Sequence, residues 1–269
     1  MDKPAEEQIF KSVTSSKKYK NVDPGVVNSL IHEGGKRFKK SADIEKYVKT
    51  KLHQVYAAYS GSINYQKINE LISEISPLNI SEKINLLLMM HSSTSERLPY
   101  YDAVRDNILR LTGTPFNRVH DLACGLNPFA FPLLFPDGKT IYTGTDIDSN
   151  LTGAFESFFV KTGFPGSYLC SSITGGGPVF SSQYIFLLKT LPCLEQQKKG
   201  VTGEILDRLD FEYLVVSFPT RSLTGKKKGM NEFYGAAFRK VMDSRGWKYS
   251  SFEIPNELFF VVKGGEGAD

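Results

Sequence analysis

The sequence predicts an α/β fold with a mostly parallel sheet, preceded by a helical region. Helical patterns fill roughly the first 90 residues. After Pro99, short β-rich runs alternate with helical segments, which is typical of βαβ units. The last two β-rich runs lie so close together that we expect them to pair antiparallel. The 269 residues suffice for two domains, which we place at 1–92 (helical) and 93–269 (α/β).

The helical region opens with a clear start signal. Asp23 is a suitable N-cap, and Pro24 then occupies the first helical position. Two later helices are expected at Tyr65–Ile75 and Ser81–His91, separated by Pro77.

Between these segments lies an amphipathic helix, which we expect to run from Ser41 to Gly61-Ser62. Its apolar residues recur at spacings of four, four, three and four: Ile44, Val48, Leu52, Val55 and Tyr59. Lys46, Lys49 and His53 fall on the opposite face. The helix should therefore pack inward and present positive charge outward.

The expected strands and helices of the second half alternate. The strands are Arg118–Ala123, Thr140–Asp146, Tyr184–Lys189, Tyr213–Phe218, Trp247–Ile254 and Leu258–Lys263. The helices between them are Leu151–Lys161, Leu194–Leu209 and Met230–Ser244. Only Pro255-Asn256 and their neighbours separate the last two strands, hence the antiparallel pair.

Composition and cysteine content exclude several classes of protein. Hydrophobic residues make up 41% and charged residues 23%, which excludes disorder throughout the chain. The longest apolar run, Leu86–Met90, is too short to cross a bilayer, and the acidic N-terminus has no apolar signal segment. Three cysteines without a CxxC pair argue against a disulfide scaffold. We therefore expect a cytoplasmic protein that does not enter a membrane.

Positive charge is concentrated in two segments. The formal net charge is only +4, but residues 11–53 carry eleven Lys or Arg against four acids. Residues 220–240 carry six against one. The rest of the chain is therefore net acidic. Two such segments favour contact with a polyanion, of which phosphate is the commonest; the alternative is that the Lys-rich helices are simply solvated.

One motif points to a nucleoside cofactor. The segment Asp121–Pro128 (DLACGLNP) follows an expected strand, and its Gly125 lets the backbone approach a ligand closely. Asp146 ends the next strand, where a carboxylate is placed to accept the hydroxyls of a ribose. Because the turn holds one glycine, we expect no pyrophosphate cradle, which favours S-adenosylmethionine over NAD. The alternative is a structural turn and a solvated acid.

A series of short motifs, in order along nearly the whole chain, resembles one enzyme family. The first are Ser16-Lys17-Lys18-Tyr19, Lys51-Leu52-His53 and His91–Arg97 (HSSTSER). The later ones are Asp121–Pro128, Leu188–Glu195 (LKTLPCLE), Ser217–Leu223 (SFPTRSL), Gly229-Met230 and Asn256-Glu257-Leu258. This order of motifs resembles the aminoglycoside-resistance 16S rRNA methyltransferases, which methylate N7 of guanine 1405 in the 30S subunit.

The resemblance implies a Rossmann-like S-adenosylmethionine-dependent methyltransferase with an N-terminal helical domain that binds 16S rRNA. A guanidinium at Arg97 would pair with the methionine carboxylate of the cofactor, and Asp146 would hold its ribose. The cofactor-binding residues it implies are Arg97, Asp121, Ala123, Gly125, Asn127, Pro128, Asp146, Ile147, Ser172 and Leu188. Two positions depart from the family, which commonly has Asp or Asn near Ser172 and Asp near Gln183. Which residue holds adenine is therefore left open.

The resemblance also implies a face for the target nucleotide. Lys189 and Phe218 are the implied catalytic residues. The alternatives are that Lys189 merely ends a strand with its hydrogen bonds satisfied inside the protein, and that Phe218 packs in the core. The residues expected to contact RNA are Lys17, Lys18, Lys20, Lys46, Lys49, His53, Arg221, Lys226, Lys227 and Lys228. The implied partner is the 30S subunit, the implied state a monomer. The four histidines show no metal spacing, so we expect no metal.

The chemistry requires little of the protein beyond alignment. Guanine N7 has an available lone pair and no proton, so its methylation needs no general base, only a target base taken out of its stack. Two other interpretations stay open at this point. One is a methyltransferase for another RNA site or a small molecule; the other is a ribosome-binding homologue that has lost catalysis.

Overall fold

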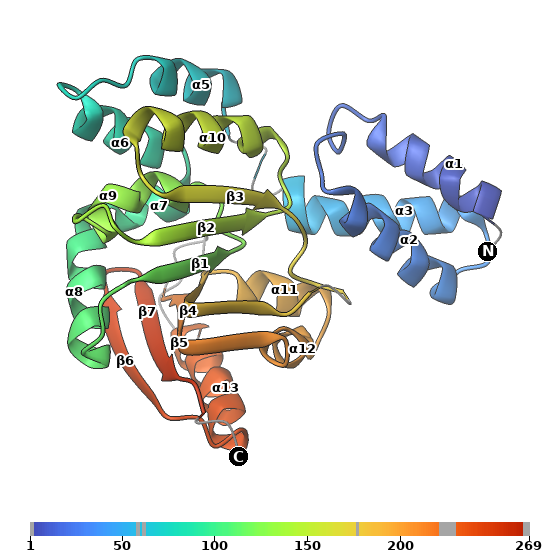
Figure 1. The fold of residues 1–269 in the computed structure, drawn as a ribbon. Helices are drawn as coiled ribbons and strands as arrows, with labels where there is room; N and C mark the ends of the chain where they lie inside the picture. The colour runs from blue at the N-terminus through green and yellow to red at the C-terminus, as the bar shows by residue number, and fades with distance from the viewer. Residues whose placement is uncertain (1–2, 58–59, 61–62, 176–177, 221–229, 266–269) are drawn as a thin grey trace.

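A seven-stranded sheet forms the centre of the protein (Figure 1). The computed structural model describes residues 3–57, 60, 63–175, 178–220 and 230–265. Within them, the strand order is β3-β2-β1-β4-β5-β7-β6, and β7 alone runs antiparallel to both of its neighbours. The strands are β1 (Arg118–Leu122), β2 (Ile141–Asp146), β3 (Gly166–Cys170), β4 (Phe180–Leu188), β5 (Leu209–Pro219), β6 (Tyr249–Ile254) and β7 (Glu257–Lys263). The predicted fold class and the antiparallel final pair are confirmed.

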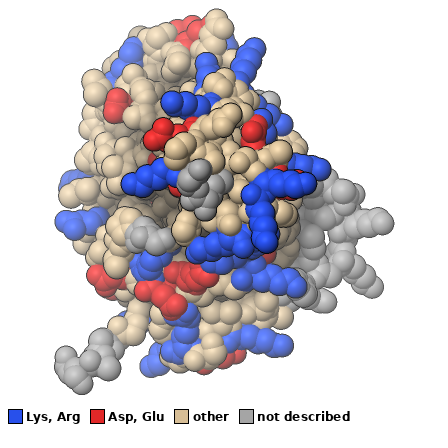
Figure 2. Space-filling view, turned by 90° about the vertical axis from the view of Figure 1, so that its right-hand side faces the viewer, with Lys and Arg blue, Asp and Glu red and all other residues tan. Residues whose placement is uncertain are grey.

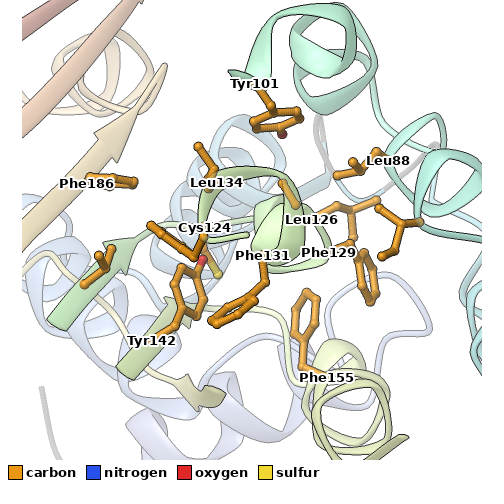
Figure 3. Close-up of a cluster of buried hydrophobic side chains, with 14 of the residues drawn as sticks. Leu88, Tyr101, Cys124, Leu126, Phe129, Phe131, Leu134, Tyr142, Phe155 and Phe186 are labelled. Carbon is orange, nitrogen blue, oxygen red and sulfur yellow. The ribbon is translucent and has the colours of Figure 1, made fainter. Parts of the chain in front are cut away.

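Helices cover both faces of the sheet, each over its own apolar core. One face packs against α5 (Tyr65–Ser73), α6 (Ile80–Leu88), α8 (Tyr101–Thr112), α9 (Phe131–Leu134) and α10 (Asn150–Thr162). The other packs against α11 (Leu191–Gln197), α12 (Val201–Leu206) and α13 (Met230–Ser244). In Figure 3, Phe129, Phe131, Tyr142 and Phe155 gather around the segment that follows β1. This aromatic packing gives the turn after β1 a rigid support.

The first helices form a small bundle with a core of its own. It comprises α1 (Lys3–Thr14), α2 (Pro24–Arg37), α3 (Ser41–Leu52) and a short π-helix, η1 (His53–Ala57). We call residues 3–57 the N-terminal bundle; it lies beyond the carboxyl ends of β2 and β3 (Figure 1). The predicted start of α2 is confirmed, since the Asp23 side chain accepts a hydrogen bond from the Val26 amide at 3.0 Å.

Packing groups the later helices with the sheet rather than with the bundle. The buried residues Ile68, Leu71, Ile84 and Leu88 of α5 and α6 belong to the same core as β1 and α10. Between α6 and α8 the chain forms α7 (Ser92–Arg97) and a turn of 3-10 helix, η2 (Leu98–Tyr100); a second such turn, η3 (Asn127–Ala130), follows β1. A domain boundary at residue 92 stays a prediction about which part folds independently.

Several elements differ from the sequence-based expectation. The helix expected from Ser41 to Gly61-Ser62 is α-helical only to Leu52 and continues as η1 to Ala57; Tyr59 and Gly61-Ser62 lie outside the described residues. Strand β3 was not predicted, because it is an edge strand with a single buried side chain, that of Tyr168. Helix α8 was also missed, although Tyr101, Val104 and Ile108 share its buried face. The single helix expected at 194–209 is wrong: Gly200, with a φ of 83°, separates α11 from α12, and Leu209 already begins β5. No helix of the described residues is long and apolar enough to cross a membrane.

Candidate cofactor site and RNA-facing surface

A cavity of about 270 Å³ opens at the carboxyl ends of β1, β2 and β4. Its walls come from the turn after β1, the loop after β2, the end of β4 with α11, and the N-terminal bundle. Predicted residues that line it are Arg97, Ala123, Gly125, Asn127, Asp146, Ile147, Ser172, Leu188 and Lys189. Ligands of open α/β sheets bind at this edge, so the cavity is the candidate cofactor site.

The turn after β1 and the acid after β2 form one hydrogen-bonded unit. The Gly125 amide donates to Oδ2 of Asp146 at 2.9 Å, and the Ile147 amide donates to Oδ1 at 2.7 Å. Gly125 has a φ of 51°, a conformation that favours glycine. An ionised carboxylate has about four acceptor sites, so Asp146 keeps acceptor capacity for hydroxyls of a ligand. Burial raises the pKa of Asp146, and hydrogen bonds from the backbone amides of Gly125, Ile147 and Asp148 oppose that rise.

Asp121 and Pro128 lie beneath the cavity rather than in its wall. Asp121 is fully buried, and its Oδ2 accepts hydrogen bonds from Asn127 (2.6 Å) and Tyr142 (2.8 Å). Its Oδ1 has no partner among the described residues. Burial raises the pKa of Asp121 to about 6. Asp121 thus holds Asn127, which does line the cavity, while Pro128 packs against β2 at Gly144.

Arg97 lines the cavity and is held there by a buried ion pair with Glu257. Its Nε and Nη2 donate to the two carboxylate oxygens of Glu257 at 3.1 and 2.7 Å, and its Nη1 donates to Asn127 at 3.1 Å. Both charged side chains are at most 2% exposed. Three of the five guanidinium N–H groups are used in this way, and Tyr101 is a further hydrogen-bonding neighbour, so the guanidinium keeps limited donor capacity for the carboxylate of a ligand.

Lys189 stands at the end of β4 in a strained conformation. Its φ of 56° places a non-glycine residue in the left-handed region. Its Nζ donates to Glu96 at 2.8 Å and lies 3.5 Å from Glu257. The amide of Lys189 donates to the Ser217 side chain, which in turn donates to Glu257. Glu257 therefore joins the two cations that border the cavity.

Glu257 is the residue that sequence reasoning missed. It was part of a motif but received no role. The signal was present, because an acid at the head of the apolar run Leu258–Val262 is buried and must find a cationic partner. Among the described residues, His91 and Ser93 also line the cavity without having been predicted.

Other predicted residues take different places. Phe218 is only 3% exposed and packs against Phe238 and Phe260 in the core, away from the cavity wall. Ser172 lines the cavity, and its Oγ accepts a hydrogen bond from the Thr174 amide. Gln183 is remote, since its side chain accepts from the Asn117 amide before β1.

The predicted RNA-facing lysines lie on the N-terminal bundle. Lys17, Lys18, Lys20, Lys46 and His53 are exposed, whereas Lys49 is partly covered and pairs with Glu45. Lys18 Nζ lies 3.1 Å from His53 Nδ1, which brings the turn between α1 and α2 to the end of α3. Figure 2 looks onto this side, where Lys and Arg side chains project with acids between them. Arg221, Lys226, Lys227 and Lys228 lie outside the described residues.

The sheet order, the glycine turn after β1 and the fixed carboxylate after β2 define a Rossmann-like S-adenosylmethionine-dependent methyltransferase. The sequence model described as ribosomal RNA methyltransferase (FmrO) matches residues 15–261. The chain belongs to this family.

Individual relatives extend over almost the whole chain. A 16S rRNA (guanine(1405)-N(7))-methyltransferase of Frankia casuarinae is 32% identical, with 96% of this chain and 94% of the relative covered. A protein of the same name from Proteus mirabilis is 28% identical, with 95% and 96% covered. The solved 16S rRNA methyltransferase RmtF, in complex with S-adenosyl-L-homocysteine, is similar with a TM-score of 0.81 at 29% identity, with 98% and 100% covered.

Proposed function

We propose that the protein transfers the methyl group of S-adenosylmethionine to N7 of guanine 1405 of 16S rRNA in the 30S subunit. The observation that carries the proposal is the position of the cofactor cavity, directly between the methyltransferase sheet and a basic helical bundle. A small substrate would have no use for a bundle of this charge. We expect the protein to act as a monomer in the cytoplasm.

The residues present fit this cofactor. Asp146 keeps acceptor capacity for ribose hydroxyls, and Arg97 keeps N–H donor capacity for a carboxylate. Ile147 and Leu188 both line the cavity and offer apolar surface for a flat base. The cofactor supplies a sulfonium-bound methyl group, which the N7 lone pair accepts as the carbon–sulfur bond breaks.

The protein's task is then to bind and orient, because no proton has to be removed. Glu257 pairs with both Arg97 and Lys189, and these ion pairs fix the positions of the two cations at the cavity. Lys189 lines the same cavity at the end of β4, and we infer that it faces the target guanine. Alignment of the reacting atoms at about 3–3.5 Å supplies most of the rate enhancement in such a reaction.

The proposed product explains drug resistance in electrostatic terms. Methylation removes the N7 acceptor from the major-groove edge of the guanine and leaves a positive charge there. A cationic aminoglycoside that binds beside this edge would lose a hydrogen bond and meet repulsion. Aminoglycoside resistance is therefore part of the proposal.

The decisive experiment compares substrates and maps the product. Transfer of a radiolabelled methyl group is measured with intact 30S subunits and with naked 16S rRNA, followed by mapping of N7-methylguanine. We expect label on 30S subunits at guanine 1405, and no label with Asp146→Ala. Label at another nucleotide would overturn the site assignment, and absence of label from both the 30S subunits and the naked 16S rRNA would overturn the enzymatic function.

A further inference from the structure

The N-terminal bundle makes its main polar contacts with the loop that follows the ribose-binding acid. The Asp23 amide donates to the Ile147 carbonyl at 2.8 Å, and Val22 pairs with Asp148 in an isolated antiparallel bridge. The Ser149 amide donates to the Asn21 carbonyl at 2.9 Å. Segment 21–23 of the bundle is thus hydrogen-bonded to segment 147–149 of the cofactor site. We call this contact the junction.

The side chain of Asp148 connects the junction to two helices. It is only 4% exposed and accepts hydrogen bonds from the hydroxyls of Tyr56, in η1 of the bundle, and Tyr65, in α5. The Asn150 amide at the start of α10 donates to the same carboxylate at 3.0 Å. One buried carboxylate therefore fixes the bundle, α5 and α10 relative to the cofactor loop.

The basic surface leads directly into the junction. Lys17, Lys18 and Lys20 lie one to four residues before Asn21, so a phosphate bound to the turn between α1 and α2 would act on the segment that contacts the cofactor loop. Lys18 also lies beside His53, the first residue of η1, which carries Tyr56. Lys18, Lys20 and His53 are each one to three residues from a residue of the junction or from Tyr56.

The bundle also forms part of the cavity itself. Val26, Leu30 and Tyr56 of the bundle line the same cavity as Gly125 and Asp146. The amide of Ile147 holds Asp146, while its carbonyl accepts from Asp23. A shift of the bundle would therefore change both the wall of the cavity and the orientation of the ribose-binding carboxylate.

We propose that Asp148 and Tyr56 are positioning residues that couple docking of the 30S subunit to cofactor affinity through the junction. This inference rests on the proposed function. Because coupling is reciprocal, a cofactor that tightens 30S binding is itself bound more tightly on the 30S subunit by the same factor. The physical origin is that both ligands favour the same placement of the bundle on segment 147–149.

The test measures the affinity for 30S subunits with and without saturating S-adenosylhomocysteine, which binds without being turned over. We expect the wild-type protein to bind 30S subunits about fivefold or more tightly with this ligand. Tyr56→Phe removes one hydrogen bond of Asp148 and keeps the ring. In this variant we expect the ratio of the 30S affinities with and without S-adenosylhomocysteine to fall towards one. The 30S affinity without this ligand should stay within about twofold of wild type, because the phosphate contacts are retained.

Tyr184→Phe is the matched control. Its hydroxyl donates to Thr112 and Thr114 at the far end of the sheet, and the ring is fully buried. It should keep the wild-type ratio, and Asp148→Asn should lose the ratio as Tyr56→Phe does. A wild-type ratio near one would overturn the inference, as would an undiminished ratio in Tyr56→Phe or an equal loss in Tyr184→Phe. If N7-methylguanine still forms at 1405 in these cases, the proposed function stands and only the coupling fails.

Discussion

At the scale of single residues, backbone amides hold the Asp146 carboxylate in place. The amides of Gly125 and Ile147 fix it without any ligand, so binding of a ribose there, as we propose, should cost little conformational freedom. The motif spacing alone predicted both Gly125 and Asp146. The partner of Arg97 could not be predicted, because Glu257 is 160 residues away and only the fold brings them together.

The first prediction concerns Asp146→Ala. Hydrogen bonds to a charged acceptor contribute about 1.5–3 kcal/mol each, so loss of two should weaken S-adenosylmethionine binding at least about 100-fold. Isothermal titration measures this directly. Asp137→Ala, an exposed aspartate before β2, is the control and should bind normally. Near-normal affinity in Asp146→Ala would remove the residue from the site.

The second prediction concerns the buried carboxyl of Asp121. Its pKa is about 6 in the folded protein against an ordinary 3.8, so the folded state holds the proton more tightly than the unfolded state. Its contribution to stability is complete below about pH 4 and is lost as the pH rises through about 6. Asparagine does not titrate, so Asp121→Asn lacks this pH-dependent loss of stability.

The free energy of unfolding in urea, measured from pH 4.5 to 7.5, tests the sign. Relative to wild type, Asp121→Asn should gain about 2 kcal/mol between the two ends of this range, most of it below about pH 6.5. A difference that does not change with pH would show that Asp121 is ionised in the folded protein at an ordinary pKa.

At the scale of elements, the sequence predicts the helices and strands whose apolar residues recur with a clear period. It misses elements such as strand β3, which packs against the rest of the protein on one side only. Strand β3 escaped notice because Leu169 on its outer side is 51% exposed, so its apolar residues do not mark one buried face. Helix α8 had a readable signal in its buried face and in Gly113, which ends it with a φ of 65°. The division of α11 from α12 at Gly200 was equally readable.

The third prediction tests how β3 packs on α10. A Cβ added at Gly166 would lie 2.1–2.4 Å from ring atoms of Phe159, so Gly166→Ala must displace a buried ring. We expect destabilisation of about 1–3 kcal/mol by thermal or urea unfolding. Gly153→Ala, on the exposed face of α10, meets nothing within 4 Å and should stabilise by about 1 kcal/mol. Equal effects from the two substitutions would contradict the packing described.

The fourth prediction concerns the turn between α1 and α2. Reversing Lys17, Lys18 and Lys20 to Glu should weaken 30S binding. It should also make the slope of log affinity against log salt concentration less steep, by about 0.7–0.9 for each phosphate that the turn neutralises. The matched control reverses three exposed lysines at the amino-terminal end of the parallel strands, opposite the cavity: Lys139, Lys248 and Lys263. Filter binding of 30S subunits at several salt concentrations compares the two triple variants. If both triple variants bind 30S subunits with the same reduced affinity, the turn has no specific role in RNA binding.

At the scale of the whole molecule, the cofactor cavity lies between two separately packed cores. The bundle core contains Val27 and Val48, and the sheet core contains Val119 and Phe155. Binding a cofactor in such a place stabilises the contact between the cores as well as the loops around the ligand. Composition and motifs predicted both parts but not their contact, which depends on the short segments 21–23 and 147–149.

The fifth prediction follows from that arrangement. S-adenosylhomocysteine should slow amide hydrogen exchange in the first turns of α2 and in η1, as well as in the loops after β1 and β2. Strand β6, at the far edge of the sheet, should exchange at an unchanged rate. Protection confined to the sheet loops would mean that the bundle does not share in cofactor binding.

The left-handed residues at the cavity edge bear on how this enzyme can evolve. Ala123, Lys189 and Asn256 all have positive φ angles, and each lies at the end of the sheet where the cavity opens. For a residue other than glycine or asparagine, that conformation costs about 1–2 kcal/mol. Glycine would relieve it, but Lys189→Gly would remove a cation that borders the cavity. If Lys189 faces the target guanine, as we propose, selection for heat resistance and selection for methyl transfer oppose each other at this position, and a more stable enzyme must gain its stability elsewhere.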